Sequence, residues 1–241
     1  MKKTLIYLYT CIFFMTSFCR LWGQNSNPEY SIQNAFVQDK KEATSSQLKA
    51  VILPLETAFE LKDTPYNRYW LSYAIYHQAL LANIQNQKKI AEAFIDRSIA
   101  LLMPLENDAE SLALLSIQQG YSTQFKGYLS MMQIGRQALQ NATHAVELNP
   151  NSLRTHLALS INDFYTPKVF GGGALAPIHL KKALETIENN PSDSLPSWGK
   201  DQVYELLVKH YRKQDQDSLA QDYLERGLIE FPTSELLQEL N

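Results

Sequence analysis

The sequence predicts an all-α protein built from repeated helix hairpins, and three observations lead to this prediction. Apolar residues recur at steps of three and four along most of the chain, and no alternating strand pattern of useful length occurs. Pro150, Pro191 and Pro232 are spaced 41 residues apart (191 − 150 = 232 − 191 = 41), and each ends a segment with helical spacing. A fixed period of this size indicates a solenoid, in which stacked repeats bury one continuous core.

Residues 201–232 show most clearly how one repeat is built. Their first helix is expected to carry Tyr204, Leu207 and Tyr211, and their second helix Ala220, Leu224 and Gly227 before the closing Pro232. Small residues let two helices approach closely, larger residues fill the space beside them, and proline stops the second helix. The polar run RKQDQD forms the turn between the helices.

With these residues and the motif ALQNATHAVELNP, which ends at Pro150, the chain resembles exported bacterial tetratricopeptide-repeat proteins. The resemblance implies a right-handed α-solenoid of about four tetratricopeptide-like hairpins. Its concave face, made mainly by the first helices, is expected to recognise a protein or peptide. On the last repeat, Tyr204, Val208 and Tyr211 are placed near that face.

The other repeats are less regular. In the segment that closes at Pro150, the first helix should hold Phe125 and Leu129, and the second Ala138, Ala142 and Ala145. In the segment that closes at Pro191, His179 and Thr186 stand where small residues belong. Upstream, two helices should meet near residues 85–87, another should run from about 108 to 125, and Pro54 should kink or interrupt its helix.

The first 23 residues have the shape of a secretory signal peptide. Lys2 and Lys3 precede an uncharged apolar run from Thr4 to Phe18, which is short for a membrane span. Cleavage after Gly23 would leave a polar segment or first helix over 24–43, the repeat domain over 44–241 and no transmembrane helix. We therefore expect an exported protein, periplasmic or secreted, and the alternative is an outer-membrane lipoprotein lipidated at Cys19.

Charge and residue content exclude several classes of function. Loss of residues 1–23 removes three cations and no acid, so the net charge changes from −3 to −6 (19 − 25), which is unfavourable for nucleic-acid binding. Both cysteines, Cys11 and Cys19, lie in that segment. The five histidines lack a metal-ligand spacing and no nucleophile motif occurs, so we expect no metal, no cofactor and no enzymatic activity.

The stretch FYTPKVFGGG, residues 164–173, interrupts the helical pattern, and it contains the loop candidate for binding: Phe170, Gly171, Gly172 and Gly173. A phosphate-binding loop would close with Lys-Ser or Lys-Thr, and neither pair follows here. A structural corner between the two helices of a hairpin is therefore favoured. This corner and the loop with Trp198 should lie at opposite ends of the helices and should not form one site.

An anion site is the alternative for the glycine loop. It would use the N-terminus of the helix that starts near Pro177, with help from Lys168, Lys181 or Lys182.

An aromatic stripe near the start of the repeat domain is the second candidate site. Its members recur at steps of three and four: Tyr66, Tyr69, Trp70, Tyr73, Tyr76 and His77. Packing in the core and between repeats is the favoured interpretation. The alternative is that Tyr69, Trp70, Tyr73 and Tyr76 bind a peptide or sugar-like ligand, since tyrosine offers a flat apolar surface with a polar tip.

The predicted function is non-enzymatic binding or scaffolding, with a protein or peptide on the concave face. The alternative is a small-solute-binding accessory component of a transport system. A groove open along its length would favour the peptide, and a closed aromatic pocket near residues 69–76 would favour the solute.

Overall fold

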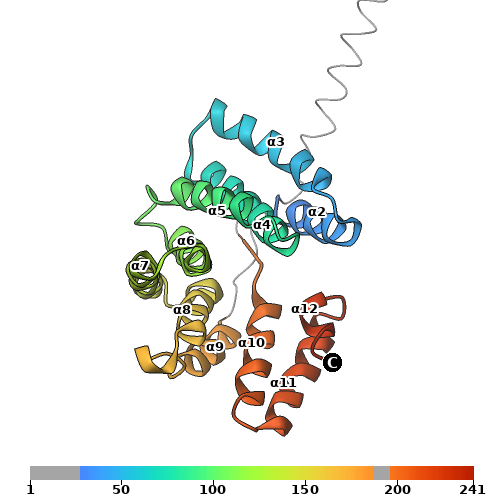
Figure 1. The fold of residues 1–241 in the computed structure, drawn as a ribbon. Helices are drawn as coiled ribbons and strands as arrows, with labels where there is room; N and C mark the ends of the chain where they lie inside the picture. Colours follow the sequence, from blue (N-terminus) through green and yellow to red (C-terminus); the bar gives the residue numbers. More distant parts are fainter. Residues whose placement is uncertain (1–27, 187–195) are drawn as a thin grey trace, which may run out of the picture.

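The computed structural model describes residues 28–186 and 196–241. Within these ranges the chain forms eleven α-helices and two short 3-10 helices with no strand, so the all-α prediction is confirmed (Figure 1). In the same ranges, no helix has both the length and the apolar character that a membrane crossing requires. The predicted signal peptide, Cys19 and Pro191 lie outside the described residues.

Four helix hairpins stack side by side, as the repeat pattern predicts. They are α4 (Pro65–Ile84) with α5 (Lys88–Leu102), α6 (Ala109–Ser122) with α7 (Tyr128–Leu148), α8 (Leu153–Tyr165) with α9 (Ala176–Glu185), and α10 (Lys200–Arg212) with α11 (Asp217–Glu230). The helices α2 (Pro28–Glu42) and α3 (Ser46–Leu61) precede them, and the short α12 (Glu235–Gln238) follows. The 3-10 helices η1 (Thr123–Phe125) and η2 (Lys168–Phe170) lie in the second and third hairpin loops.

Local sequence fixes where three of the first helices begin. Thr64, Asp108 and Ser152 each accept a hydrogen bond from a backbone N–H in the first turn of α4, α6 and α8. Such caps satisfy amide groups that have no partner within the helix.

Small residues bring helices together where the sequence predicts it. Ala138, Ala142 and Ala145 lie on one face of α7 and are completely buried. On α11, Gly227 faces α10 so closely that an added Cβ would come within 3.0 Å of the Tyr204 side chain. Each hairpin therefore depends on side-chain size at a few positions.

Buried polar pairs set the register between successive first helices. Gln118 Nε2 on α6 donates to Ser72 Oγ on α4 at 2.9 Å, and Asn162 Nδ2 on α8 donates to Ser116 Oγ on α6 at 2.7 Å. Sliding one helix along its neighbour would break both bonds, at a cost of about 0.5–1.5 kcal/mol each, and would leave only the bonds that these side chains make within their own hairpins. The first helices are thus held in fixed positions along the concave face.

The segment 196–199 and helix α2 close one end of the concave face. Trp198 Nε1 donates to the Tyr69 hydroxyl at 3.0 Å, and the indole stacks on the Tyr73 ring with 5.4 Å between centroids. The Glu29 carboxylate on α2 accepts hydrogen bonds from the Ser197 N–H and hydroxyl at 2.7 and 2.8 Å. Neither segment belongs to a hairpin, yet both cover the first one.

The N-terminal helix also contacts the C-terminal helix. Lys40 of α2 pairs with Glu235 and Glu239 at 3.3 Å, and Lys41 pairs with Glu235 at 3.4 Å. In Figure 1, α2 accordingly lies across from α12. The first and last helices of the described solenoid are therefore in contact with each other.

The expected first helix of the second hairpin is wrong, and the expected interruption of a helix at Pro54 does not occur. Phe125 and Leu129 do not lie in the first helix of the second hairpin: Phe125 is in η1, and Leu129 is 81% exposed in the first turn of α7. The reason is a break at Gly127, which has an extended backbone and caps α7. Pro54 does not interrupt α3, which runs through it; the residue is exposed, where water can satisfy the freed carbonyl.

A histidine pair accounts for the irregular third hairpin. His156 Nε2 of α8 lies 2.9 Å from the Pro150 carbonyl oxygen, to which it donates. The Nδ1 atom of that neutral ring then accepts from His179 Nδ1 of α9, also at 2.9 Å. His179 therefore occupies a position where the tetratricopeptide pattern has a small residue.

Candidate ligand-binding pocket

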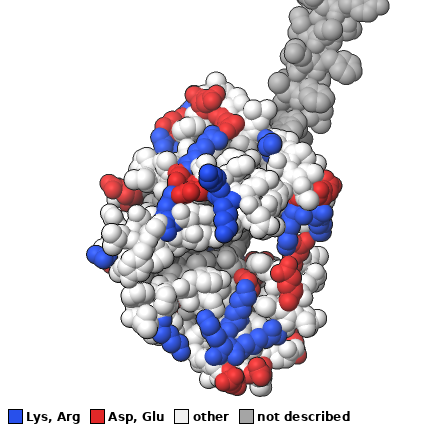
Figure 2. Space-filling view, in the orientation of Figure 1, with Lys and Arg blue, Asp and Glu red and all other residues white. Residues whose placement is uncertain are grey.

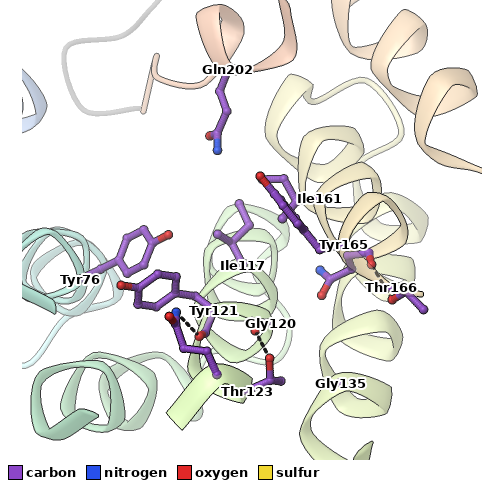
Figure 3. A pocket seen from close by; sticks show the side chains of 12 residues that line it. Tyr76, Ile117, Gly120, Tyr121, Thr123, Gly135, Ile161, Tyr165, Thr166 and Gln202 are labelled. Atoms are coloured by element: carbon purple, nitrogen blue, oxygen red, sulfur yellow. Dashed lines mark hydrogen bonds between the residues drawn. The ribbon is translucent and has the colours of Figure 1, made fainter. Parts of the chain in front are cut away.

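A pocket of about 510 Å³ lies on the concave face between the first helices of all four hairpins. Tyr76 of α4, Tyr121 of α6, Tyr165 of α8 and Gln202 of α10 surround it (Figure 3). The other lining residues are Ile117, Gly120, Thr123, Gln124, Gly135, Ile161, Asn162 and Thr166. The volume falls within the range of about 300–1,000 Å³ that is usual for small-molecule sites.

Three tyrosines form the aromatic wall of the pocket. The rings of Tyr76 and Tyr121 meet edge to face, with 5.7 Å between centroids, and Tyr165 lies across the cavity from them (Figure 3). Burial raises the pKa of all three hydroxyls above the usual value near 10. At neutral pH the three groups are therefore uncharged phenols that can donate or accept a hydrogen bond.

The pocket is polar but uncharged. None of its twelve lining residues is Asp, Glu, Lys, Arg or His. Among the described residues, no hydrogen bond engages the Tyr76 hydroxyl, the Tyr165 hydroxyl or the side-chain amide of Gln202, and Figure 3 shows Gln202 directed toward the cavity. These groups can therefore bond to a neutral ligand, while apolar contact comes from Ile117, Ile161 and the tyrosine rings.

Two glycines keep the pocket open. At Gly135 of α7, an added Cβ would meet no atom within 4 Å, so the space beside it is free. At Gly120 of α6, the same atom would lie 2.8 Å from Asn162 Oδ1. Larger residues at these positions would narrow the cavity or displace Asn162.

The predicted aromatic stripe on α4 divides into two parts. Tyr69, Trp70 and Tyr73 are almost completely buried, in contact with one another and, for Tyr69 and Tyr73, with Trp198. Tyr76 is only partly buried and lines the pocket. Packing therefore accounts for the first three side chains, and Tyr76 is the member of the stripe that a ligand could contact.

The residues predicted for the last repeat pack inside the C-terminal hairpin. Val208 is completely buried, and Tyr211 stacks on Tyr223 of α11 with 5.6 Å between centroids. Tyr204 donates from its hydroxyl to Glu230 at 3.1 Å. On α10, the residue that reaches the pocket is instead Gln202.

The glycine loop forms a structural corner between α8 and α9. An added Cβ on Gly172 would lie 2.0 Å from the Thr166 carbonyl oxygen, and Gly171 and Gly173 adopt left-handed backbone angles, with φ of 87° and 91°. These conformations explain the run of glycines without a ligand. Phe170, the fourth residue of the loop candidate, is 56% exposed.

The amides at the start of α9 already have an anionic partner. Asp163 Oδ2 accepts from the Leu175 and Ala176 N–H groups at 2.8 and 2.7 Å. An exogenous anion at this helix terminus would have to displace a carboxylate, so the anion alternative finds no free donors there. Asp163 itself is a structural cap.

The two predicted loops lie at opposite ends of α8, as expected. Arg154, near the start of α8, donates to the Trp198 carbonyl oxygen at 3.2 Å, whereas Gly172 packs against Thr166 just after the helix ends. The glycine loop and the Trp198 loop do not form one site.

Sequence reasoning missed most of the pocket. Tyr121, Tyr165 and Gln202 were not among the predicted binding residues. A usable signal is the recurrence of tyrosine in three successive first helices, at Tyr76, Tyr121 and Tyr165, with spacings of 45 and 44 residues (121 − 76 = 45; 165 − 121 = 44). It is hidden by the 41-residue proline period, because the hairpins differ in length.

Searches of family models and of curated proteins find no match to the chain. Among solved structures, the chain is similar to a thermophilic tetratricopeptide-repeat protein of Thermus thermophilus, with 16% identity, coverage of 86% of this chain and 95% of the other, and a TM-score of 0.54. It is also similar to the haemophore HusA from Porphyromonas gingivalis, with 17% identity, coverage of 77% and 94%, and a TM-score of 0.52. At these identities the similarities show the fold, an all-α solenoid of tetratricopeptide-like hairpins.

Proposed function

We propose that this tetratricopeptide-like helical-repeat protein is an exported, non-catalytic binding protein whose concave-face pocket takes a small uncharged ligand. A helical-repeat fold of this type is suited to binding and scaffolding, because its stacked first helices present a shaped surface. The observation that carries the proposal is the pocket itself: three protonated tyrosines and several amide or hydroxyl groups around about 510 Å³ without a charged side chain.

The closed end of the concave face favours a compact ligand over a long peptide. Trp198 and α2 fill the space beside Tyr69 and Tyr73, so an extended chain could not run along the whole face. The cavity is confined to the other end, near Tyr76. An aromatic pocket at this place supports the small-solute alternative raised by the sequence.

The lining indicates the chemistry of the ligand. Tyrosine rings favour contact with flat or ring-shaped groups, and the free hydroxyl and amide groups favour neutral hydrogen-bonding partners. Haem, the cargo that the name haemophore implies for HusA, carries two carboxylates, and no Lys or Arg lines this pocket. We therefore do not extend haem binding to this chain.

The absence of catalysis and the export are parts of the proposal with their own support. No charged acid, base or histidine lines the pocket that could transfer a proton at neutral pH. Export rests on the apolar run from Thr4 to Phe18 after two lysines. Secretion of an enzymatically tagged chain, tested with and without residues 1–23, would check the second point.

Gly135 offers a direct test of the pocket. Gly135→Leu would fill free space and block the cavity, whereas the control Gly135→Ala adds one methyl group and leaves most of the volume open. Both changes favour the helix, since glycine is the weaker helix former. The measurement is a thermal shift with neutral disaccharides, nucleosides and N-acetyl-tyrosinamide. We expect a compound that raises the melting temperature of the parent and of Gly135→Ala but not of Gly135→Leu.

The same panel separates the two ligand classes. A shift caused by a disaccharide or nucleoside supports the solute, and a shift by N-acetyl-tyrosinamide alone supports a peptide side chain in the pocket. A shift that persists unchanged in Gly135→Leu would place the ligand elsewhere and contradict the proposal.

A protein partner is the second candidate, and one observation favours it. Tyr165, at the rim of the pocket, is 63% exposed and has room for further contacts. Crosslinking of the chain in its native envelope fraction tests this candidate. Recovery of one stoichiometric protein that Tyr165→Ala no longer captures would support it.

A further inference from the structure

We propose that the hairpin-loop edge of this solenoid docks onto anionic lipid bilayers. This edge consists of the four loops inside the hairpins, residues 85–87, 123–127, 166–175 and 213–216, with the first residues of the helices that follow them. The proposal does not depend on the pocket ligand, because it rests on a different surface.

Contacts between neighbouring loops show that they share one edge. Asn83 Nδ2, beside the first loop, donates to Gln124 Oε1 in the second at 3.4 Å. The second and third loops both line the pocket, through Gln124 and Thr166. Lys213 of the fourth loop lies 4.8 Å above the Phe164 ring, beside the third. The edge therefore runs along all four hairpins and borders the mouth of the pocket.

Exposed apolar side chains occur at three of the four loops. Ile84 and Ile90 flank the first loop, Tyr128 and Leu129 follow the second, and Val169 and Phe170 form the tip of the third. Val169 is the most exposed large apolar residue of the described chain, with 86% of its surface accessible. Leu61 and Met103 are comparably exposed at the opposite edge, so apolar exposure permits contact with another phase and charge must distinguish the two edges.

The third loop presents its apolar tip rigidly. Phe170 N–H donates to the Pro167 carbonyl at 2.8 Å, and Gly171 N–H donates to the Lys168 carbonyl at 2.9 Å. Gly172 packs against Thr166, while the space beside Gly171 is empty, so the tip stands clear of the body of the protein. Little conformational entropy would be lost when this tip inserts into another phase.

The charge of the hairpin-loop edge indicates what kind of surface it contacts. Lys88 and Lys89 begin α5, Lys168 lies in η2 and Lys213 in the fourth loop, and no ion pair engages any of them within the described ranges. Figure 2 shows Lys and Arg side chains gathered over the part of the molecule where Figure 1 places α9 and α10. The chain as a whole carries a net negative charge, so this local excess of cations is not a property of the whole surface.

Acidic residues on the edge are few. Glu92 and Asp96 are paired with Lys126, which leaves Asp215 and Asp217 beside Lys213. In the described loops at the opposite edge, between hairpins, Asp63 is paired with Arg68, which leaves Glu106 and Asp108 with the single cation Lys62. The two edges therefore differ in the sign of their free charges.

A lipid bilayer fits this combination better than a single protein partner. Apolar side chains that protrude from three separate loops would need a matching cavity at each point on a folded protein. A bilayer interface accepts them anywhere, and its anionic headgroups attract lysines by about 1 kcal/mol each. The expected association is weak, reversible and sensitive to salt.

Tryptophan fluorescence tests whether the tip enters the bilayer. The chain from Gln24 on is used, because the run from Thr4 to Phe18 would itself bind lipid, and the core consists of residues from Ile32 onward. Phe170→Trp should shift its emission to shorter wavelength with vesicles of phosphatidylglycerol and phosphatidylethanolamine and be quenched by brominated lipid. The control Leu61→Trp, at an exposed position of the opposite edge, should do neither.

Vesicle sedimentation tests the role of charge. The double change Lys89→Gln with Lys168→Gln should weaken binding about tenfold or more, since two lysines contribute about 2 kcal/mol and 1.4 kcal/mol is tenfold. The control, Lys62→Gln with Lys200→Gln, removes the same charge from the opposite edge, beside the starts of α4 and α10, and should leave binding unchanged.

Each of the following results would overturn the proposal. They are no sedimentation with anionic vesicles, equal binding to neutral phosphatidylcholine vesicles, and equal loss in both lysine doubles. Retention on immobilised polyglutamate without any vesicle binding would also overturn it and would assign the edge to an acidic protein segment.

Discussion

The two ends of the concave face contain the same kinds of side chain but differ in what covers them. At one end, Tyr69 and Tyr73 of α4 pack against Trp198 and are buried. Three residues further along the same helix, Tyr76 faces a cavity that it shares with Tyr121 and Tyr165. Residue type does not distinguish these tyrosines, and helix periodicity places them on one broad face.

The covering segments account for the difference. Helix α2 and residues 196–199 both lie outside the hairpins, and they meet through Glu29 and Ser197 over the first repeat. Residues 196–199 also reach the start of α8, where Arg154 donates to the Trp198 carbonyl oxygen. Within the described chain they do not cover Tyr121 or Tyr165, so these tyrosines remain available. A solenoid can thus turn part of its concave face into core and leave the rest as a binding site.

Trp198→Ala should produce the largest effect, because it removes the main cover of the closed end. It deletes the stack on Tyr73 and leaves the Tyr69 hydroxyl without its donor, at an expected cost of about 3–4 kcal/mol in the free energy of unfolding. Urea denaturation would measure it. The control Tyr128→Ala, at an exposed aromatic residue, should change stability by less than about 0.5 kcal/mol.

The same variant tests whether the two ends are separate. If they are, Trp198→Ala lowers stability while the ligand that the panel identifies retains its affinity for the pocket. A loss of affinity as large as the loss of stability would show that the closed end shapes the pocket.

Stability should fall with decreasing pH because of His77, which lies between the two ends. Its ring contacts Tyr73 on one side and Tyr76 on the other, and burial lowers its pKa to about 4. The unfolded chain, with a histidine pKa near 6.5, takes up the proton first, so stability is lost as the pH falls from about 6.5 towards 4. Because the ring keeps some contact with solvent, we expect the free energy of unfolding to fall by about 1–2 kcal/mol over this range.

Comparison with His77→Gln isolates this contribution. The parent and the variant should differ in their pH dependence by that amount between about pH 7 and pH 4. His156 and His179, whose pKa values burial also lowers, contribute in the same direction to both proteins. Identical pH profiles would show that His77 is not responsible.

Glu29→Gln should weaken the closed end moderately. The substitution keeps the shape of the side chain but removes the charge that strengthens its two hydrogen bonds to Ser197, at an expected cost of about 1–1.5 kcal/mol. Glu42→Gln, at an exposed position of the same helix, is the matched control. Equal melting temperatures for the two variants would mean that the link between α2 and residues 196–199 contributes little.

The sequence predicted the hairpins well because their signals are local. Closing prolines and small residues such as Ala142 and Gly227 act within one repeat, and the structure confirms four hairpins. The break at Gly127 was missed because apolar spacing continues across it.

The pocket was harder to predict because it depends on contacts distant in sequence. Whether Tyr73 or Tyr76 is covered is decided by Trp198, more than 120 residues away, and by α2, which lies outside the repeat. Gln202, in the first turn of α10, lines the cavity, while the repeat pattern indicates Val208 and Tyr211, which pack in the core. Residue type alone could not show which of these side chains line the pocket and which pack in the core.

The smallest expected effects concern the two glycines of the open end, which should respond in opposite directions. Gly135→Ala enters free space in the middle of α7 and should stabilise the protein by about 0.5–1 kcal/mol, because alanine is the better helix former. Gly120→Ala brings the same methyl group within 2.8 Å of Asn162 Oδ1, whose amide also donates to Ser116. The close contact should outweigh the better helix propensity of alanine, so that Gly120→Ala lowers the free energy of unfolding by about 1 kcal/mol or less. Urea denaturation of both variants checks this. Stabilisation by both would show that the Asn162 side chain can move away from the added methyl group.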